Sequence, residues 1–359
     1  MNFNPEKRGS VYCNHEAWTV LESQIREINP SSLFVLTDSN TKRVCLPYLI
    51  NKLTVQNQFE VLEITAGESH KNISSCLQLW EELSEKGADR KSLLLNLGGG
   101  MVTDLGGFVA STFKRGIEFI NIPTSLLAMV DASVGGKNGV DLGSIKNQIG
   151  VIKNPYSVII DTQFLKTLPQ EEITSGFAEM LKHGLITSED YWSRVVQFDV
   201  SNEVEATKLI WESIEIKNKV VSEDPYEKEL RKTLNYGHTL GHAIESFCLA
   251  SEKRKSILHG EAIAIGMILA TYISSELVGF PKEKLNNVTN TILQHFKKIS
   301  FSINEIEEII LLLKFDKKNA NGKVYFVLLK DVGLHRVNFE VPNDLLYNAF
   351  DFYKNFKKN

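Results

Sequence analysis

The chain has 359 residues, of which 43% are hydrophobic and 23% are charged. These fractions are typical of soluble globular proteins and argue against a disordered, fibrous or membrane protein. The length exceeds that of a typical single domain, so we expect two packed domains. The net charge of -4 provides no basic surface for nucleic acid, and we therefore expect no nucleic-acid partner.

The N-terminal residues and the spacing of the cysteines both favour a cytoplasmic location. The four cysteines are scattered without a CxxC pair, which is typical of reduced thiols. The first ten residues, MNFNPEKRGS, lack the apolar stretch of a secretory signal. The longest uncharged segment, Ala262–Ser275, is shorter than the roughly 20 residues that a membrane span needs, and it predicts a buried helix. We expect a cytoplasmic protein without a membrane partner.

Residues 1–165 alternate short apolar segments with segments of helical period. The spacing at Trp18–Ile28 and Ile73–Leu83 predicts helices between strands, which is the alternation of a parallel α/β sheet. We therefore expect a Rossmann-like domain over residues 1–165. Its predicted strands are apolar, rich in β-branched residues and buried on both faces: Leu33–Thr37, Val61–Ile64, Ser92–Leu97, Glu118–Ile122 and Ser157–Ile160.

Residues 166–359 have a different pattern, in which long helical periods dominate. Lys323–Leu329 carries the only clear strand pattern there. The expected fold is thus an α/β domain followed by a mainly helical domain, with a boundary near residue 165. The predicted helices are Glu171–His183, Glu203–Val221, Arg231–Phe247, Glu261–Glu276 and Glu283–Ile299.

A glycine-rich turn, Gly98–Gly100, follows the strand predicted at Ser92–Leu97 and precedes a helical segment. Unpaired amide donors and the helix dipole make such a helix start attractive to a pyrophosphate. The spacing is not GxGxxG, because Thr103 stands at the third glycine position. The turn is either an anion site or a tight turn that packs a helix onto the sheet. Asp38, at the end of a predicted strand, is likewise either a ribose ligand or a turn residue.

His238 and His242 lie four residues apart in LNYGHTLGHAIES, so a helix would project both rings from one face. His259 in HGEAIAIGM and Glu179 in GFAEMLKHG add a third imidazole and a carboxylate. These ligand types suit Zn2+, and three protein ligands leave an open position for catalysis. The spacing alone equally permits a pair of hydrogen-bonded histidines and a surface glutamate.

Long cationic side chains are set among glycines in the segment 115–146. The glycines Gly135–Gly136 would let such side chains reach a bound anion without obstruction. Any one lysine taken alone is more often solvated than functional. The candidate clamps for phosphate or carboxylate, including two from the helical half, are Arg115, Lys137, Lys146, Lys182 and Arg231.

Several separated segments together resemble the 3-dehydroquinate synthase family. They are GGGMVTDLGGFVASTFKRG, IPTSLLAMVDASVGGKNGV, KNQIG, LKTLP, GFAEMLKHG, RKTLNYGHTLGHAIE, HGEAIAIGM and the DKK of residues 316–318. The resemblance covers residues 33–330. It implies an NAD-binding α/β domain, a helical domain that binds Zn2+ or Co2+ and the substrate, and a homodimer.

The resemblance also implies roles for individual residues, with His242 facing the substrate and not the metal. The implied metal ligands are Glu179, His238 and His259. The implied NAD-binding residues are Asp38, Asn40, Glu68, Lys71, Gly100, Met101, Val102, Thr103, Asp104, Thr124, Ser125, Lys137, Lys146 and Thr167. The implied substrate-binding and catalytic residues are Arg115, Asp131, Lys137, Lys146, Asn147, Lys182, Lys217, Arg231, Asn235, His242 and Lys318.

The implied reaction converts 3-deoxy-D-arabino-heptulosonate 7-phosphate, a small sugar acid phosphate, to 3-dehydroquinate and phosphate in the shikimate pathway of aromatic amino acid biosynthesis. It proceeds by transient NAD-dependent oxidation, phosphate elimination, reduction and intramolecular aldol closure. The alternatives are another sugar phosphate cyclase, a metal-dependent polyol dehydrogenase of related fold, and an inactive binding module. Arg231 and Asn235 favour a 3-dehydroquinate synthase over another cyclase, because the family uses these residues on the carboxylate side of the substrate.

Overall fold

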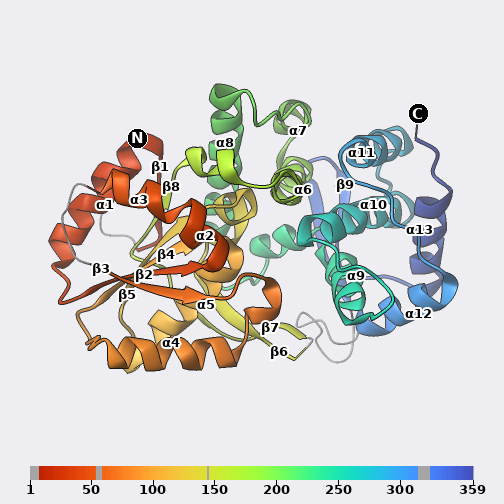
Figure 1. Cartoon of the computed structure of the whole chain (residues 1–359). Coiled ribbons are helices and arrows are strands. Elements are labelled where there is room, and N and C mark those ends of the chain that lie inside the picture. The colour runs from red at the N-terminus through yellow and green to blue at the C-terminus, as the bar shows by residue number, and fades with distance from the viewer. Residues whose placement is uncertain (1–7, 54–58, 144, 314–323, 359) are drawn as a thin grey trace. The chain divides into compact units, whose positions relative to one another are not determined.

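The structure is a computed structural model that describes residues 8–53, 59–143, 145–313 and 324–358 (Figure 1). The chain divides into two compact units, Met1–Pro169 and Gln170–Asn359, whereas we expected a boundary near residue 165. Lys318, one of the implied substrate residues, lies outside the described residues.

The first unit contains a six-stranded sheet whose neighbouring strands all run parallel, in the order β1-β8-β5-β4-β2-β3. Five of the six strands coincide with predicted apolar segments, so the expected parallel α/β sheet is confirmed. The edge strand β1 was not predicted. The strands are β1 (Ser10–Cys13), β2 (Leu33–Asp38), β3 (Phe59–Ile64), β4 (Leu93–Gly98), β5 (Glu118–Pro123) and β8 (Ser157–Ile160).

Helices cover both faces of this sheet, as Figure 1 shows with α4 on the side opposite α1 and α3. Phe34 and Leu36 of β2 point to the face on which α4 (Ile73–Glu85) and α5 (Gly100–Thr112) pack, and all belong to one buried cluster. On the other face, α1 (Asn14–Ile28) packs beside α3 (Leu46–Lys52), which follows α2 (Ser39–Val44). Burial on both faces explains the uninterrupted apolar strands.

The strand order reverses between β2 and β4. The chain leaves β2 toward β3 on one side and leaves β4 toward β5 on the other. In open α/β sheets, ligands bind at the carboxyl ends of the strands at such a reversal point. Asp38 ends β2 and Gly98 ends β4, so both candidate dinucleotide features lie at this position.

An antiparallel hairpin of β6 (Lys137–Leu142) and β7 (Ile145–Ile152) follows β5. It was not predicted, because its sequence, rich in Lys, Asn and Gly, lacks a clear apolar period. Short helical turns complete the unit: η1 (Glu68–His70), η2 (Phe113–Arg115), the π-turn η3 (Ala128–Ala132) and η4 (Thr162–Thr167).

The second unit is mainly helical, as expected. The helices are α6 (Gln170–Thr187), α7 (Glu189–Val195), α8 (Glu203–Glu223), α9 (His238–Ala250), α10 (His259–Val278), α11 (Lys282–His295), α12 (Ile303–Leu312), α13 (Asn343–Asn355) and the turn η5 (Leu230–Asn235). A hairpin of β9 (Tyr325–Asp331) and β10 (Leu334–Glu340) accompanies them. The strand predicted at Lys323–Leu329 corresponds to β9, whereas β10, which has no apolar run, was missed.

Helix α10 forms the core of this unit. Its length and composition would suit a membrane span, but 67% of its most apolar window is buried within the structure. Residues from Ala262 to Ser274 are buried at almost every position. The predicted buried helix is therefore confirmed.

The prediction of a single helix over Arg231–Phe247 is wrong. The chain forms η5, breaks at Gly237 with φ of 77°, and starts α9 at His238. The break lies against α10, where a Cβ at Gly266 would come within 2.0 Å of the Gly237 carbonyl oxygen. Glycines at both positions allow the two backbones to touch and allow the left-handed φ. The helix predicted to end at Ile299 also stops earlier, at His295.

Candidate functional site

Three helices of the second unit bring Glu179, His238 and His259 together. Glu179 of α6 is fully buried, and its Oε1 lies 3.3 Å from His238 Nε2 of α9 and 3.4 Å from His259 Nε2 of α10. Lys182, one turn further along α6, makes an ion pair with Glu179 Oε2. The Glu179 carboxylate is therefore within reach of both implied histidine ligands.

A close contact between α10 and α6 sets this arrangement. The Gly260 amide donates to Ser175 Oγ at 3.0 Å, and a Cβ at Gly260 would lie only 2.0 Å from the Ser175 carbonyl oxygen. Ser175 precedes Glu179 by about one helical turn. The contact thus places the start of α10, with His259, beside Glu179.

The Nδ1 atoms of His238 and His259 each lie at hydrogen-bond distance from an oxygen atom. His238 Nδ1 lies 3.2 Å from the Tyr236 carbonyl oxygen, and His259 Nδ1 lies 3.1 Å from Glu245 Oε2. An oxygen that only accepts requires hydrogen on Nδ1, which leaves Nε2 of a neutral ring with a lone pair. Both Nε2 atoms are then turned toward Glu179 as donors for a metal ion.

The electrostatics of these side chains favour a bound cation. Neither oxygen of buried Glu179 accepts a well-directed hydrogen bond within the described residues. Burial lowers the pKa of His259, but the carboxylates of Glu245 and Glu179 outweigh burial and raise the pKa to about 9. Burial and nearby Lys182 keep the pKa of His238 low. The raised pKa of His259 reflects the negative charge of two carboxylates at its ring, and the same charge attracts a metal ion. On metal binding His259 would release its proton, and a carboxylate with two neutral imidazoles fits the donor preferences of Zn2+ or Co2+.

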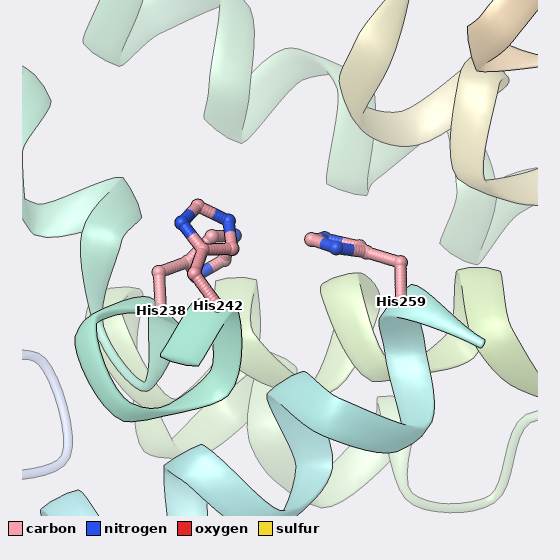
Figure 2. Close-up of side chains that lie close together, drawn as sticks. All are labelled: His238, His242 and His259. Atoms are coloured by element: carbon pink, nitrogen blue, oxygen red, sulfur yellow. The ribbon is translucent and has the colours of Figure 1, made fainter. Parts of the chain in front are cut away.

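His242 lies beside the same group. Its ring centroid is 5.1 Å from that of His238 and 5.7 Å from that of His259. Figure 2 shows the His259 ring, carried by α10, facing the two rings from α9. One nitrogen from each ring lies within 4.8 Å of the others, so three histidines form a second, overlapping donor set.

The remaining predicted residues of the helical unit are mostly buried cations. Lys182, Lys217 and Arg231 are 1%, 6% and 3% exposed. Arg231 donates to the Pro225 carbonyl oxygen at 2.8 Å, and Asn235 Nδ2 donates to Glu227 Oε1 at 2.6 Å. Both residues thus lie on an ordered segment that leads into α9.

In the α/β unit, the glycine turn forms the start of α5. Gly99 is the N-cap residue and no side chain caps the helix, so the first amides of α5 are available to an anion. The Thr124 amide donates to the Gly98 carbonyl oxygen at 3.0 Å, which places Thr124 and Ser125 at this turn. The other implied residues of this helix start are Gly100, Met101, Val102, Thr103 and Asp104.

Asp38 caps α2. Its Oδ1 accepts from the Asn40 and Thr41 amides, each at 2.8 Å. This cap explains the aspartate as a turn residue without any ligand. A ribose role for Asp38 and Asn40 rests on their position at the sheet's reversal point and stays a proposal.

A buried network surrounds Lys71. Its ammonium group donates to Asp104 Oδ2 at 2.6 Å and to Asn147 Oδ1 at 2.7 Å. Burial lowers the pKa of Lys71, but the carboxylates of Asp104 and Glu68 outweigh it and raise the pKa. Lys146 also lies 3.0 Å from Glu68. The structure thus gathers five of the implied residues beside the start of α5.

Thr167 and Asp131 are further predicted residues of this unit, and their neighbours lie at the glycine turn. Thr167 and Thr124 both hydrogen-bond the thiol of Cys45, so they lie together. Asp131 lies on η3, next to Ala132, which faces the backbone of Gly100.

Two predicted cations of the α/β unit are exposed. Lys137 lies at the first residue of β6. Arg115 follows the other end of the 13-residue α5, about 20 Å from the glycine turn. Arg115 was implied for the substrate, and this role stays a prediction.

Comparisons with known proteins identify the family. A family model described as 3-dehydroquinate synthase N-terminal matches residues 61–175, and one described as 3-dehydroquinate synthase C-terminal matches residues 176–319. The 3-dehydroquinate synthase of Parabacteroides distasonis is 43% identical over 336 residues, which cover 93% of this chain and 94% of that protein. The chain belongs to the 3-dehydroquinate synthase family. The family predicted from the sequence motifs is confirmed.

Solved structures agree on the fold. A 2-deoxy-scyllo-inosose synthase complexed with carbaglucose-6-phosphate, NAD+ and Co2+ is 26% identical, with a TM-score of 0.81 and coverage of 96% of this chain and 97% of that one. The 2-epi-5-epi-valiolone synthase from Streptomyces hygroscopicus subsp. jinggangensis 5008, with NAD+ and Zn2+ bound, is 21% identical with a TM-score of 0.85 and 99% coverage of both chains. The second similarity concerns the fold alone.

Sequence reasoning missed Glu245, whose carboxylate accepts a hydrogen bond from His259 Nδ1. A signal was available in GHTLGHAIES, where Glu245 follows His242 by three residues and His238 by seven. That spacing puts all three on one face of a helix.

Proposed function

We propose that this chain is a 3-dehydroquinate synthase, which converts 3-deoxy-D-arabino-heptulosonate 7-phosphate to 3-dehydroquinate and phosphate. The observation that carries the proposal is the meeting of Glu179, His238 and His259 from three helices, within a chain of this family. Buried Glu179 lies beside Lys182 and two imidazoles, and its carboxylate and those imidazoles are donors that suit the metal cation of the proposed reaction.

We propose Glu179, His238 and His259 as ligands of Zn2+ or Co2+, and the start of α5 with the Lys71 network as the NAD-binding part of the α/β unit. A related cyclase was solved with NAD+ and Co2+, which supports this pair of cofactors. Held by these residues, the metal would supply a positive charge that lowers the pKa of a substrate hydroxyl, and NAD would supply a reversible hydride acceptor.

The chain's own contribution is to bind and orient the substrate. Charge-assisted hydrogen bonds from lysine and arginine suit a substrate that carries a phosphate and a carboxylate. Arg231 and Asn235 are proposed for the carboxylate, since their ordered segment fixes both side chains. Lys137, Lys146, Asn147, Lys182 and His242 are proposed for the phosphate. The remaining substrate residues, Arg115, Asp131, Lys217 and Lys318, are proposed from the family resemblance.

We also propose a cytoplasmic homodimer. The cysteines are free thiols, which is consistent with a reducing compartment. Three of them are buried: Cys45, Cys76 and Cys248. Light scattering of the purified full-length chain measures the assembly directly, and a monomer at micromolar concentration would contradict the dimer.

One assay separates the candidate functions. The protein, loaded with Zn2+ and given NAD far below the substrate concentration, is incubated with heptulosonate phosphate. We expect many phosphates released per NAD and no accumulation of NADH. Release from a hexose phosphate but not from heptulosonate phosphate would indicate another cyclase, and NADH accumulation with glycerol would indicate a polyol dehydrogenase. If the protein turned over none of these substrates, the result would contradict the proposal that it is an enzyme and would favour an inactive binding module.

A further inference from the structure

We infer that Glu245 is a positioning residue of the metal centre: its carboxylate holds His259 Nδ1 and so directs Nε2 of that ring toward the ion. The inference rests on the proposed function, because it assumes that Glu179, His238 and His259 bind a metal. It concerns a residue outside the implied ligand set.

The contact is at hydrogen-bond distance and involves a buried carboxylate. Glu245 Oε2 lies 3.1 Å from His259 Nδ1, and Glu245 is 6% exposed. The other nitrogen of the same ring faces Glu179 at 3.4 Å. One imidazole therefore lies between two carboxylates, Glu245 at Nδ1 and Glu179 at Nε2.

The position of Glu245 follows from helix geometry. Residues spaced by three and four share a helix face, and α9 presents His238, His242 and Glu245 with this spacing. The helix that supplies one proposed ligand thus also supplies the residue that orients another, across the interface with α10.

The two proposed histidine ligands differ in how they are held. His238 Nδ1 is held by a backbone carbonyl, that of Tyr236, which a side-chain substitution does not remove. His259 begins α10, its side chain is 22% exposed, and its Nδ1 faces a side chain instead. The orientation of His259 should therefore depend on Glu245 far more than the orientation of His238 depends on any one side chain.

The physical consequence is a change in metal affinity. A carboxylate that accepts from Nδ1–H selects the tautomer with a lone pair on Nε2, restricts rotation of the ring and makes Nε2 more basic. Removing such a partner typically costs about 10–100-fold in metal affinity. A carboxylate that merely fills space would not have this effect.

The test compares Glu245→Ala, Glu245→Gln and a control, Glu252→Ala. Glu252 is exposed in the segment between α9 and α10, so its loss changes the charge without touching His259. Zn2+ affinity of the metal-free full-length protein is measured by competition with a chromophoric chelator, together with the visible absorption spectrum of bound Co2+. The unfolding temperature of the metal-free form reports on packing.

We expect about 10–100-fold weaker Zn2+ binding and an altered Co2+ spectrum for Glu245→Ala. Glu245→Gln should lose less, because its amide oxygen still accepts from Nδ1, and Glu252→Ala should match wild type. Affinity of Glu245→Ala within twofold of wild type would overturn the inference. Equal losses in both Glu245 variants with equally lowered metal-free unfolding temperatures would also overturn it, in favour of a packing role.

Two outcomes separate this inference from the proposed function. A wild-type protein that binds no Zn2+ would overturn the metal centre and the inference together, whereas failure at Glu245 alone leaves the metal centre standing. If Glu245→Ala does not fold, Glu245→Gln decides: weaker binding or an altered Co2+ spectrum supports the inference, and an unchanged affinity and spectrum overturn it.

Discussion

The amide of Gly260 donates to Ser175 Oγ at 3.0 Å and joins the start of α10 to α6 one turn before Glu179. A methyl group at Gly260 would overlap the Ser175 carbonyl oxygen, from which a Cβ would lie 2.0 Å away. This contact couples the packing of the two helices to the distance between two proposed metal ligands.

We expect Gly260→Ala to destabilise the fold by about 1–3 kcal/mol, because the overlap forces α10 away from α6. Its Zn2+ affinity should fall as well. Ser175→Ala is the matched control: it removes one hydrogen bond, worth about 1 kcal/mol, without an overlap. Urea unfolding and chelator competition measure both effects, and equal behaviour of the two variants would contradict the role of the close contact.

His259→Ala and His242→Ala should differ in what they lose. If His259 is a ligand and His242 faces the substrate, His259→Ala loses bound metal on dialysis. His242→Ala keeps the metal and loses turnover. Metal content by atomic absorption and phosphate release measure the two properties. Equal metal loss in both variants would instead favour the three-histidine donor set.

Lys71→Met should weaken both the fold and NAD binding. The substitution leaves Asp104 without its partner, in a pair whose side chains are 5% and 18% exposed. Breaking a buried pair on one side costs about 3 kcal/mol. Lys86→Met is the control, because Lys86 and Glu60 form an exposed pair and its loss should be too small to measure. Chemical unfolding and NAD titration check the prediction, and equal effects in both variants would refute it.

The Arg254–Glu305 pair should contribute to stability only above acidic pH. Hydrogen bonds from Arg254 are the main cause that lowers the pKa of Glu305 to about 2, against an opposing effect of burial. A carboxyl group with a lowered folded-state pKa stabilises the fold above its unfolded pKa near 4.5 and loses this contribution as pH falls toward 2.

Arg254→Met should therefore cost about 1–2 kcal/mol at pH 7 and progressively less below pH 4.5. Unfolding in urea at several pH values between 7 and 3 measures the difference from wild type. A difference that stays constant over this range would show that Arg254 acts through packing, for instance over the Phe301 ring.

Local patterns in the sequence were sufficient for most elements. The strand at Leu33–Asp38 and the helix at Ile73–Glu85 appear within two residues of their predicted bounds. A strand buried on both faces needs a continuous apolar run, and an amphipathic helix needs a 3.6-residue period. Both requirements act between near neighbours in the chain, so the sequence displays them directly.

Local sequence patterns gave wrong or missing predictions where a contact with a distant segment sets the backbone conformation. The helical period continues from Arg231 to Phe247, yet the chain breaks at Gly237 because α10 approaches it there. The hairpin β6–β7 and strand β10 carry no apolar run of their own, so their pairing partners define them.

The sequence by itself determined the family and supplied the candidate metal ligands, because a motif such as GHTLGH places its imidazoles on one helix face. Only the tertiary structure decided that Glu179, His238 and His259 meet, and that Glu245 lies behind His259. Distances between atoms on three helices depend on how the helices pack, and packing is set by contacts such as Gly260 on Ser175 that no local period reveals.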